Sequence, residues 1–262
     1  MTRRHTTSTF AAILILVTVS GCELGDELGD FEPSDELLDA LEEADANAEL
    51  PDAILAGGRP DFQSHISVGY MTAPNGYICS GQRISRTLFL TAAHCVNAVN
   101  KQRTPWNRVK VGFGKRSANF AVTATRAWAN PKFNGRPGSP FDIGIVVMSR
   151  GVPYVPNASI GRIQVGQVVD MVGYGAPTFE RRSGQALVSE RVSNGHFGIQ
   201  LNGAGVCSGD SGGGVMNPFK QNQILATNAY AEACGVGNQA GVMDLRRDGN
   251  RQPLQYVGAK FD

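Results

Sequence analysis

The sequence predicts an all-β fold, and three observations favour it. The chain has 262 residues, of which 42% are hydrophobic, so it can bury a substantial core. It contains 32 glycines and few long apolar stretches with helical periodicity, which indicates many turns and short strands. Six segments rich in apolar and β-branched residues are bounded by turn residues, as strands are: 109–114, 121–129, 143–148, 168–175, 185–192 and 223–231.

The first 21 residues are typical of a signal peptide. Arg3 and Arg4 precede an apolar stretch, residues 10–19, that is too short to span a bilayer. We therefore expect the protein to be exported, and either held at the cell envelope or secreted.

Cys22 closes this signal in the sequence "VSGC", which resembles the lipobox of bacterial lipoproteins, whose cysteine becomes the lipidated N-terminus. Lipidation would also explain the odd count of five cysteines, because it leaves four for two disulfides in an oxidising compartment. The alternative is ordinary signal cleavage nearby, with Cys22 free. A lipid on Cys22 is the only membrane attachment that we expect.

Residues 22–53 are predicted to be an acidic linker or pro-segment. Between Glu23 and Asp52 there are thirteen acidic residues and no Lys or Arg. The run after Ser34 fits a capped helix, but a solvated spacer is the favoured interpretation. Residues 54–262, the predicted domain, hold 22 basic and ten acidic residues, a net charge of +12. These basic residues are scattered, which argues against nucleic-acid binding.

Two short motifs carry candidate chemistry. In "LTAAHCV", residues 90–96, a strand-like run ends in two alanines, His94 and Cys95. In "GVCSGDSGGGV", residues 205–215, Ser211 follows an acid among glycines, which let backbone N–H groups approach a ligand closely. Either motif alone also fits a structural histidine or a surface turn. Together they supply the base and the nucleophile of covalent catalysis.

The motifs TAAHC, residues 91–95, and GDSGG, residues 209–213, resemble the two hallmark motifs of the chymotrypsin/trypsin-like serine protease family. The resemblance covers roughly residues 54–262. It implies two packed six-stranded antiparallel β-barrels with the active site in the cleft between them. It also implies a serine endopeptidase that acts on proteins or peptides through an acyl-enzyme. We expect a monomer without a cofactor. We also expect no calcium site, because no Asp or Glu lies between Asp61 and Asp142 to form the family's calcium loop.

The acid that orients the histidine has few candidates. Four acidic residues lie between the two motifs: Asp142, Asp170, Glu180 and Glu190. Asp142 begins "DIGIVVM", which resembles the Asp-Ile-Ala-Leu-Leu motif of the family, and it follows His94 at about the family's spacing. Asp170 lies inside a strand pattern and is expected to face outward. We therefore select Asp142.

The resemblance assigns the catalytic roles. Ser211 attacks the carbonyl, His94 takes and returns the proton, and Asp142 fixes the histidine tautomer. The backbone N–H groups of Gly209 and Ser211 form the oxyanion hole.

The resemblance also pairs the four remaining cysteines, Cys79 with Cys95 and Cys207 with Cys234. A zinc site is the alternative, but no two cysteines are closely spaced in the sequence. His65 and His196 have no matching surroundings and are expected to be structural or exposed.

Asp210 is the family's partner for an N-terminal ammonium that proteolytic cleavage frees. The stretch "AILAGG", residues 53–58, resembles the family's Ile-Val-Gly-Gly start but has one inserted residue. Cleavage by an activating protease would therefore free Ile54 or Leu55, unless the chain is not processed. We expect an activation ion pair between Asp210 and Ile54.

Four residues are expected to form the specificity pocket: Gly205, Val206, Ala231 and Gly241. Gly205 falls where trypsin carries a carboxylate, so the pocket lacks a charge for Lys or Arg. We expect cleavage after uncharged apolar residues of medium size. The chain end, residues 241–262, shows no sign of the family's usual final amphipathic helix.

Two other functions stay open on the sequence. One is a catalytically silent protease homologue that acts as an anchored binding module. The other is an esterase that uses the same triad.

Overall fold

The computed structural model describes residues 58–61, 63–114, 121–136, 139–192, 195–202, 204–231, 234 and 239–262. All of them belong to one compact unit, Pro51–Asp262. The predicted signal peptide, Cys22, the acidic segment and Ile54 lie outside the described residues. Among the helices that are described, none has the length and apolar character needed to cross a membrane.

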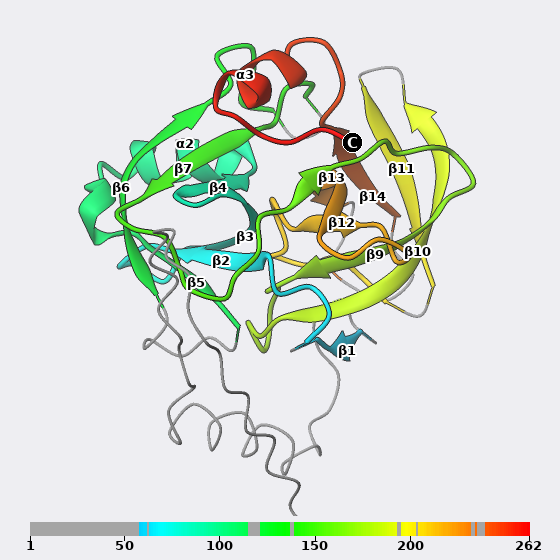
Figure 1. Ribbon diagram of the computed structural model, residues 1–262, viewed down its shortest axis with the longest axis horizontal. Coiled ribbons are helices and arrows are strands. Elements are labelled where there is room, and N and C mark those ends of the chain that lie inside the picture. The colour runs from blue at the N-terminus through cyan, green and yellow to red at the C-terminus, as the bar shows by residue number, and fades with distance from the viewer. Residues whose placement is uncertain are drawn as a thin grey trace, which may run out of the picture. The chain divides into compact units, whose positions relative to one another are not determined.

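Six strands of the first half form a closed barrel in the order β2-β3-β4-β7-β6-β5, and every neighbouring pair is antiparallel. This barrel occupies the left of Figure 1. Its strands are β2 (Val68–Thr72), β3 (Ile78–Ser85), β4 (Leu88–Thr91), β5 (Lys110–Phe113), β6 (Val122–Ala129) and β7 (Gly144–Met148).

Six strands of the second half run in the order β10-β11-β14-β13-β12-β9, and β9 pairs back with β10 to close a second antiparallel barrel. This barrel lies on the right of Figure 1. Its strands are β9 (Val168–Gly173), β10 (Arg182–Val192), β11 (His196–Leu201), β12 (Gly214–Met216), β13 (Gln223–Ala231) and β14 (Gln239–Asp244). Two short strands are added to it, β1 (Arg59–Pro60) beside β10 and β8 (Ser159–Ile160) parallel to β13. The predicted pair of six-stranded barrels is thus confirmed.

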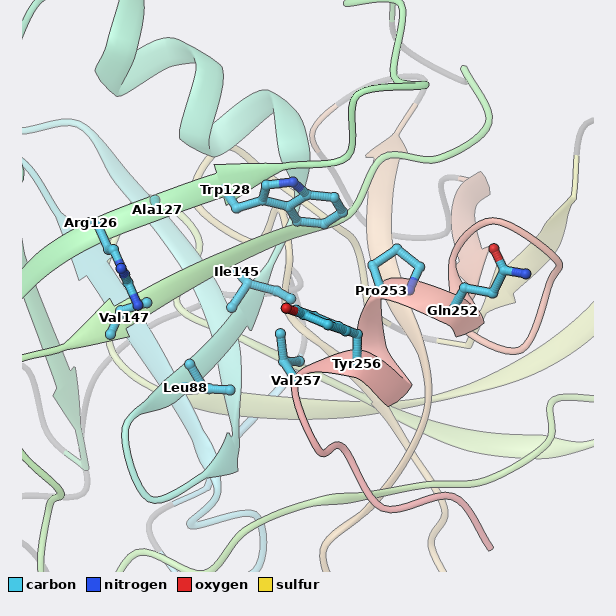
Figure 2. Close-up of a pocket in the computed structure, with 10 residues that line it drawn as sticks. All are labelled: Leu88, Arg126, Ala127, Trp128, Ile145, Val147, Gln252, Pro253, Tyr256 and Val257. Atoms are coloured by element: carbon cyan, nitrogen blue, oxygen red, sulfur yellow. The ribbon is translucent and has the colours of Figure 1, made fainter.

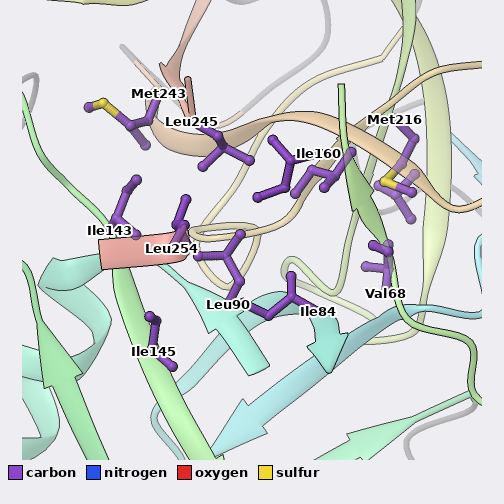
Figure 3. Packing of buried hydrophobic residues seen from close by; sticks show 14 of the residues in the cluster. Val68, Ile84, Leu90, Ile143, Ile145, Ile160, Met216, Met243, Leu245 and Leu254 are labelled. Atoms are coloured by element: carbon purple, nitrogen blue, oxygen red, sulfur yellow. The ribbon is translucent and has the colours of Figure 1, made fainter. Parts of the chain in front are cut away.

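Each barrel is filled by inward-facing apolar side chains, as the two-residue period of a strand requires. A third apolar cluster joins the barrels. It combines Leu90 and Ile145 of the first barrel with Met216 and Met243 of the second (Figure 3). Fully burying one such side chain stabilises the fold by about 1.5–3 kcal/mol, so this cluster contributes strongly to holding the barrels together.

The chain end differs from the sequence-based expectation. A short helix, α3 (Arg251–Tyr256), is present, so the prediction of no final helix is wrong. The helix tolerates Pro253 because this residue lies in the first turn, where a backbone N–H has no intrahelical partner. Leu254 is fully buried and packs into the cluster between the barrels (Figure 3). Six residues with one buried leucine are too few to show helical periodicity.

Candidate active site

His94 and Asp142 meet because of the strand pairing in the first barrel. Strand β4 pairs with β7 so that Thr91 lies opposite Gly144. The residues just after β4 and just before β7 are therefore neighbours. His94 follows in helix α2 (Ala93–Lys101), and Asp142 precedes β7.

Asp142 holds both the backbone and the ring of His94. Its Oδ1 accepts a hydrogen bond from the His94 backbone N–H at 2.9 Å, and its Oδ2 lies 2.7 Å from His94 Nδ1. The Asp142 side chain is 3% exposed, whereas that of His94 is 32% exposed. Because a carboxylate only accepts, Nδ1 carries the proton and Nε2 is left as the basic nitrogen. This is the arrangement that a general base needs.

Ser211 lies in a tightly held turn of the second barrel, residues 207–212, which we call the nucleophile loop. Each of its six backbone carbonyl groups accepts a hydrogen bond. Their donors are, in chain order, the Asp210 N–H, the Ala176 N–H, the Ser80 hydroxyl, the Gly213 N–H, the Ser80 N–H and the Gln82 side-chain amide. The orientations of these peptide groups are therefore fixed.

The N–H groups of Gly209 and Ser211 take no part in the hydrogen bonds that hold this loop. Within the described part of the chain, neither donates a hydrogen bond to a protein acceptor. Gly209 has a φ of +101°, and a Cβ there would approach the Tyr174 carbonyl to 2.9 Å, so only glycine fits this turn. Two unpaired donors beside a serine are what stabilisation of an oxyanion requires.

Ser211 and His94 belong to different barrels, and the turn that bears Ser211 lies against the start of α2. The Sγ atom of Cys95, next to His94, is 3.8 Å from the Ser211 carbonyl oxygen. Across the residues that the structure describes, the Ser211 hydroxyl makes no hydrogen bond to His94. In enzymes without substrate this bond is often long and tightens only in the complex.

Both disulfides implied by the resemblance are present, Cys79–Cys95 and Cys207–Cys234. The sulfur atoms of the first lie with the His94 ring nitrogen in a group whose atoms are all within 4.8 Å of one another. Such a group could bind a metal only through thiolates. Because both cysteines are oxidised to the disulfide, they supply none.

Asp210 is 2% exposed, and its carboxylate accepts hydrogen bonds from the N–H groups of Gly175 and Cys207. A Cβ at Gly173 or Gly175 would collide with this carboxylate, so glycine is needed at both positions. Burial raises the pKa of Asp210 to about 7, although the two N–H bonds oppose the shift. No Lys, Arg or His of the described ranges forms an ion pair with it.

A hollow of about 200 Å³ lies beside Ser211. This is below the roughly 300–1,000 Å³ of pockets that hold drug-sized ligands, so it suits a single side chain. Val206 and Ala231, two of the four predicted pocket residues, line it, whereas Gly205 and Gly241 do not. The Tyr230 ring lies across Gly241 instead. Sequence reasoning missed Tyr230 and Asn228, which also line the hollow.

A larger groove of about 660 Å³ lies elsewhere, between α3 and the outer face of β6 and β7. Figure 2 shows Trp128 and Tyr256 at this groove, with Ile145 and Val257 beside them. Neither the His94–Asp142 pair nor the nucleophile loop lines it. It is therefore separate from the candidate active site.

Two described histidines lie outside the motifs, His65 and His196, and His65 forms a second cluster with carboxylates. Its Nδ1 lies 2.5 Å from Asp61 and its Nε2 lies 3.4 Å from Asp170. Asp170, expected to face outward, has a side chain only 18% exposed because it packs against this ring. His196 is 1% exposed, and burial lowers its pKa. Both histidines are buried, so neither is an exposed surface residue.

The Trypsin family model matches residues 57–244 of the chain. Among solved structures, the crystal structure of scabies mite inactivated protease paralogue S-D1 is similar, with a TM-score of 0.63 and 11% identity. The match covers 77% of this chain and 97% of that one, and at this identity it speaks for the fold alone. No curated protein matches the sequence. The family match spans most of the chain and includes both barrels, the His94–Asp142 pair and the nucleophile loop, so the chain belongs to the trypsin family.

Proposed function

We propose that this protein is a serine endopeptidase that uses Ser211, His94 and Asp142 as its catalytic triad. Membership of the trypsin family supports a serine peptidase that acts on peptides or proteins. The geometry around these three residues supports the assignment. Asp142 occupies His94 Nδ1 and leaves Nε2 for the substrate side, and among the described residues the Gly209 and Ser211 N–H groups, on either side of Asp210, have no acceptor.

In the proposed reaction the Ser211 hydroxyl attacks the scissile carbonyl, and its proton passes to His94 Nε2. Asp142 stabilises the resulting imidazolium through Nδ1, while the N–H groups of Gly209 and Ser211 bind the oxyanion. His94 then protonates the leaving amine as the C–N bond breaks and the acyl-enzyme forms. A water molecule, deprotonated by His94, hydrolyses the ester and regenerates Ser211.

The proposed substrates are cleaved after uncharged apolar residues. Val206 and Ala231 line the hollow beside Ser211, and its described lining contains no carboxylate that could pair with Lys or Arg. Burying an unpaired charge there costs several kcal/mol, whereas each buried methylene gains only about 0.8 kcal/mol. In a panel of peptides that differ only at this residue, faster turnover after Arg than after Leu would overturn the preference.

Activation by cleavage at Ala53 or Ile54 is part of the proposal. The buried Asp210 carboxylate supports it, because a cation introduced beside this group would relieve the cost of its burial. If Cys22 carries a lipid, the same cleavage would release the basic domain from its anchor. N-terminal sequencing and intact mass of the exported protein report lipidation and cleavage together.

Labelling of the exported protein with an active-site phosphonate tests the triad. We expect one label per chain, lost in Ser211→Ala and strongly slowed in Asp142→Asn. Asp170→Asn is the matched control and should label at the wild-type rate. If Asp142→Asn labels normally and Asp170→Asn does not, the assignment of the acid is wrong.

A catalytically silent homologue is the second candidate. It is favoured by the absence, in the described structure, of a hydrogen bond between Ser211 and His94. No labelling of either the full or the cleaved chain would establish it. Turnover of esters without turnover of matched peptides would instead indicate the third candidate, an esterase.

A further inference from the structure

Ser80 reaches the nucleophile loop from the first barrel. It lies on β3, directly after Cys79, and is fully buried. Its backbone N–H donates to the Ser211 carbonyl at 2.9 Å, and its hydroxyl donates to the Gly209 carbonyl at 2.8 Å. One residue of the first barrel thus contacts the loop of the second barrel on both sides of Asp210, with its hydroxyl on the Gly209 carbonyl and its backbone N–H on the Ser211 carbonyl.

The direction of the Ser80 hydroxyl is fixed by a third bond. Its oxygen accepts the Tyr174 N–H at 2.8 Å. An amide N–H can only donate, so the hydroxyl proton must go to the Gly209 carbonyl. Because the group is buried, water does not compete for it, and a hydroxyl that donates and accepts in this way is fully satisfied.

The peptides that Ser80 holds alternate with those that present the oxyanion donors. The Gly209 N–H belongs to the peptide 208–209 and the Ser211 N–H to the peptide 210–211. Ser80 bonds the carbonyls of the peptides 209–210 and 211–212. Gly209 lacks a Cβ and has wide torsional freedom, so a peptide beside it keeps one orientation only when it is held.

We propose that Ser80 is a positioning residue for the oxyanion hole, and that its hydroxyl keeps the Gly209 and Ser211 N–H groups aimed at one point. The proposal rests on the proposed function, since it concerns the rate of that reaction. Ser80 itself touches no reacting atom. Its loss should therefore impair the transition state and leave substrate binding nearly unchanged.

The test compares Ser80→Ala with Ser67→Ala in the full chain. Ser67 is also fully buried in the first half of the chain, but its hydroxyl has no hydrogen-bond partner among the described residues. We expect Ser80→Ala to lower kcat by about 10- to 100-fold, less than the roughly 10²–10³-fold loss for deleting an oxyanion donor. KM should change little, and Ser67→Ala should keep the wild-type kcat.

Binding of a peptide boronate, which mimics the tetrahedral state, should weaken in Ser80→Ala in parallel with kcat. Should this variant not fold, Ser80→Cys keeps the size of the side chain and a weak donor, and an intermediate loss of kcat is expected. A folded Ser80→Ala with unchanged kcat, or an equal loss in Ser67→Ala, would overturn the role of Ser80 alone. An inactive wild type would overturn the proposed function and this role with it.

Discussion

Two histidines in the described part of the chain are paired with carboxylates, and they differ in what their second nitrogen does. His94 has Nδ1 on Asp142, and its side chain is 32% exposed. His65 has Nδ1 on Asp61 and Nε2 on Asp170, and its side chain is 11% exposed. The first ring keeps a basic nitrogen accessible, whereas the second has both nitrogens occupied.

The comparison shows that a His–Asp pair is not in itself a sign of catalysis. Burial disfavours the charged form of His65, but the bonds and charges of Asp170 and Asp61 outweigh it and raise its pKa to about 9. His65 is therefore a fixed cation at neutral pH and cannot take a proton from a substrate. A general base needs an accessible nitrogen, and the proposal gives this role to His94 Nε2, because the carboxylate of Asp142 occupies only Nδ1.

The largest expected effect separates the two histidines by activity. His94→Gln should lower kcat by roughly 10⁴- to 10⁶-fold, because it removes the proposed base of the triad. His65→Gln should leave kcat close to that of the wild type when assayed well below its melting temperature. Initial rates on one peptide substrate measure both, and circular dichroism checks that each variant is folded. A comparable loss of kcat in the two variants would contradict the division of roles.

Much of this division could be anticipated from local sequence. The six predicted strand segments correspond to β5, β6, β7, β9, β10 and β13. Asp142 was selected by its place before a buried strand, and the β4–β7 pairing brings it to His94. Such features depend on residues close in sequence or on a recurring motif.

The features that sequence reasoning missed depend on distant partners. Nothing local marks His65 as the partner of Asp170, or Ser80 as the donor to Gly209, because each pair forms only when the two halves of the chain pack against each other. Tyr230 lies in a predicted strand, but its contact with Gly241 follows from strand pairing with a bulge. These contacts became visible only in the folded chain.

Asp210 is a buried carboxylate of a different kind, because among the described residues no histidine lies beside it. Its pKa is raised from 3.8 to about 7, so the folded chain binds a proton that the unfolded chain has lost. The free energy of unfolding should therefore fall as pH rises from 4 to 7, by up to about 4 kcal/mol, and stay level above. Urea unfolding of the uncleaved Ser211→Ala chain at pH 5 and pH 8 measures about 3 kcal/mol of this change.

Asp210→Asn in the same background is the control for that slope, because an amide does not titrate. The variant should lose the part of the pH dependence that belongs to Asp210. Cleaved protein should lose it as well if a new terminal ammonium pairs with the carboxylate. An identical slope in the parent and in Asp210→Asn would show that Asp210 is ionised throughout this range.

The smallest expected effect concerns the stability that His65 supplies. Its pKa is raised from 6.5 to about 9, so the folded chain holds the proton more tightly than the unfolded chain does. The contribution is full below pH 6.5, declines as pH rises and is lost above pH 9. We expect His65→Gln to lower the free energy of unfolding by about 1–3 kcal/mol at pH 6, with a smaller difference at pH 10.

Asp170→Asn should shift this pH-dependent loss of stability to lower pH, since it removes one of the two carboxylates that hold the charge. If the difference between wild type and His65→Gln is the same at pH 6 and pH 10, His65 stabilises the fold by packing and not as a cation.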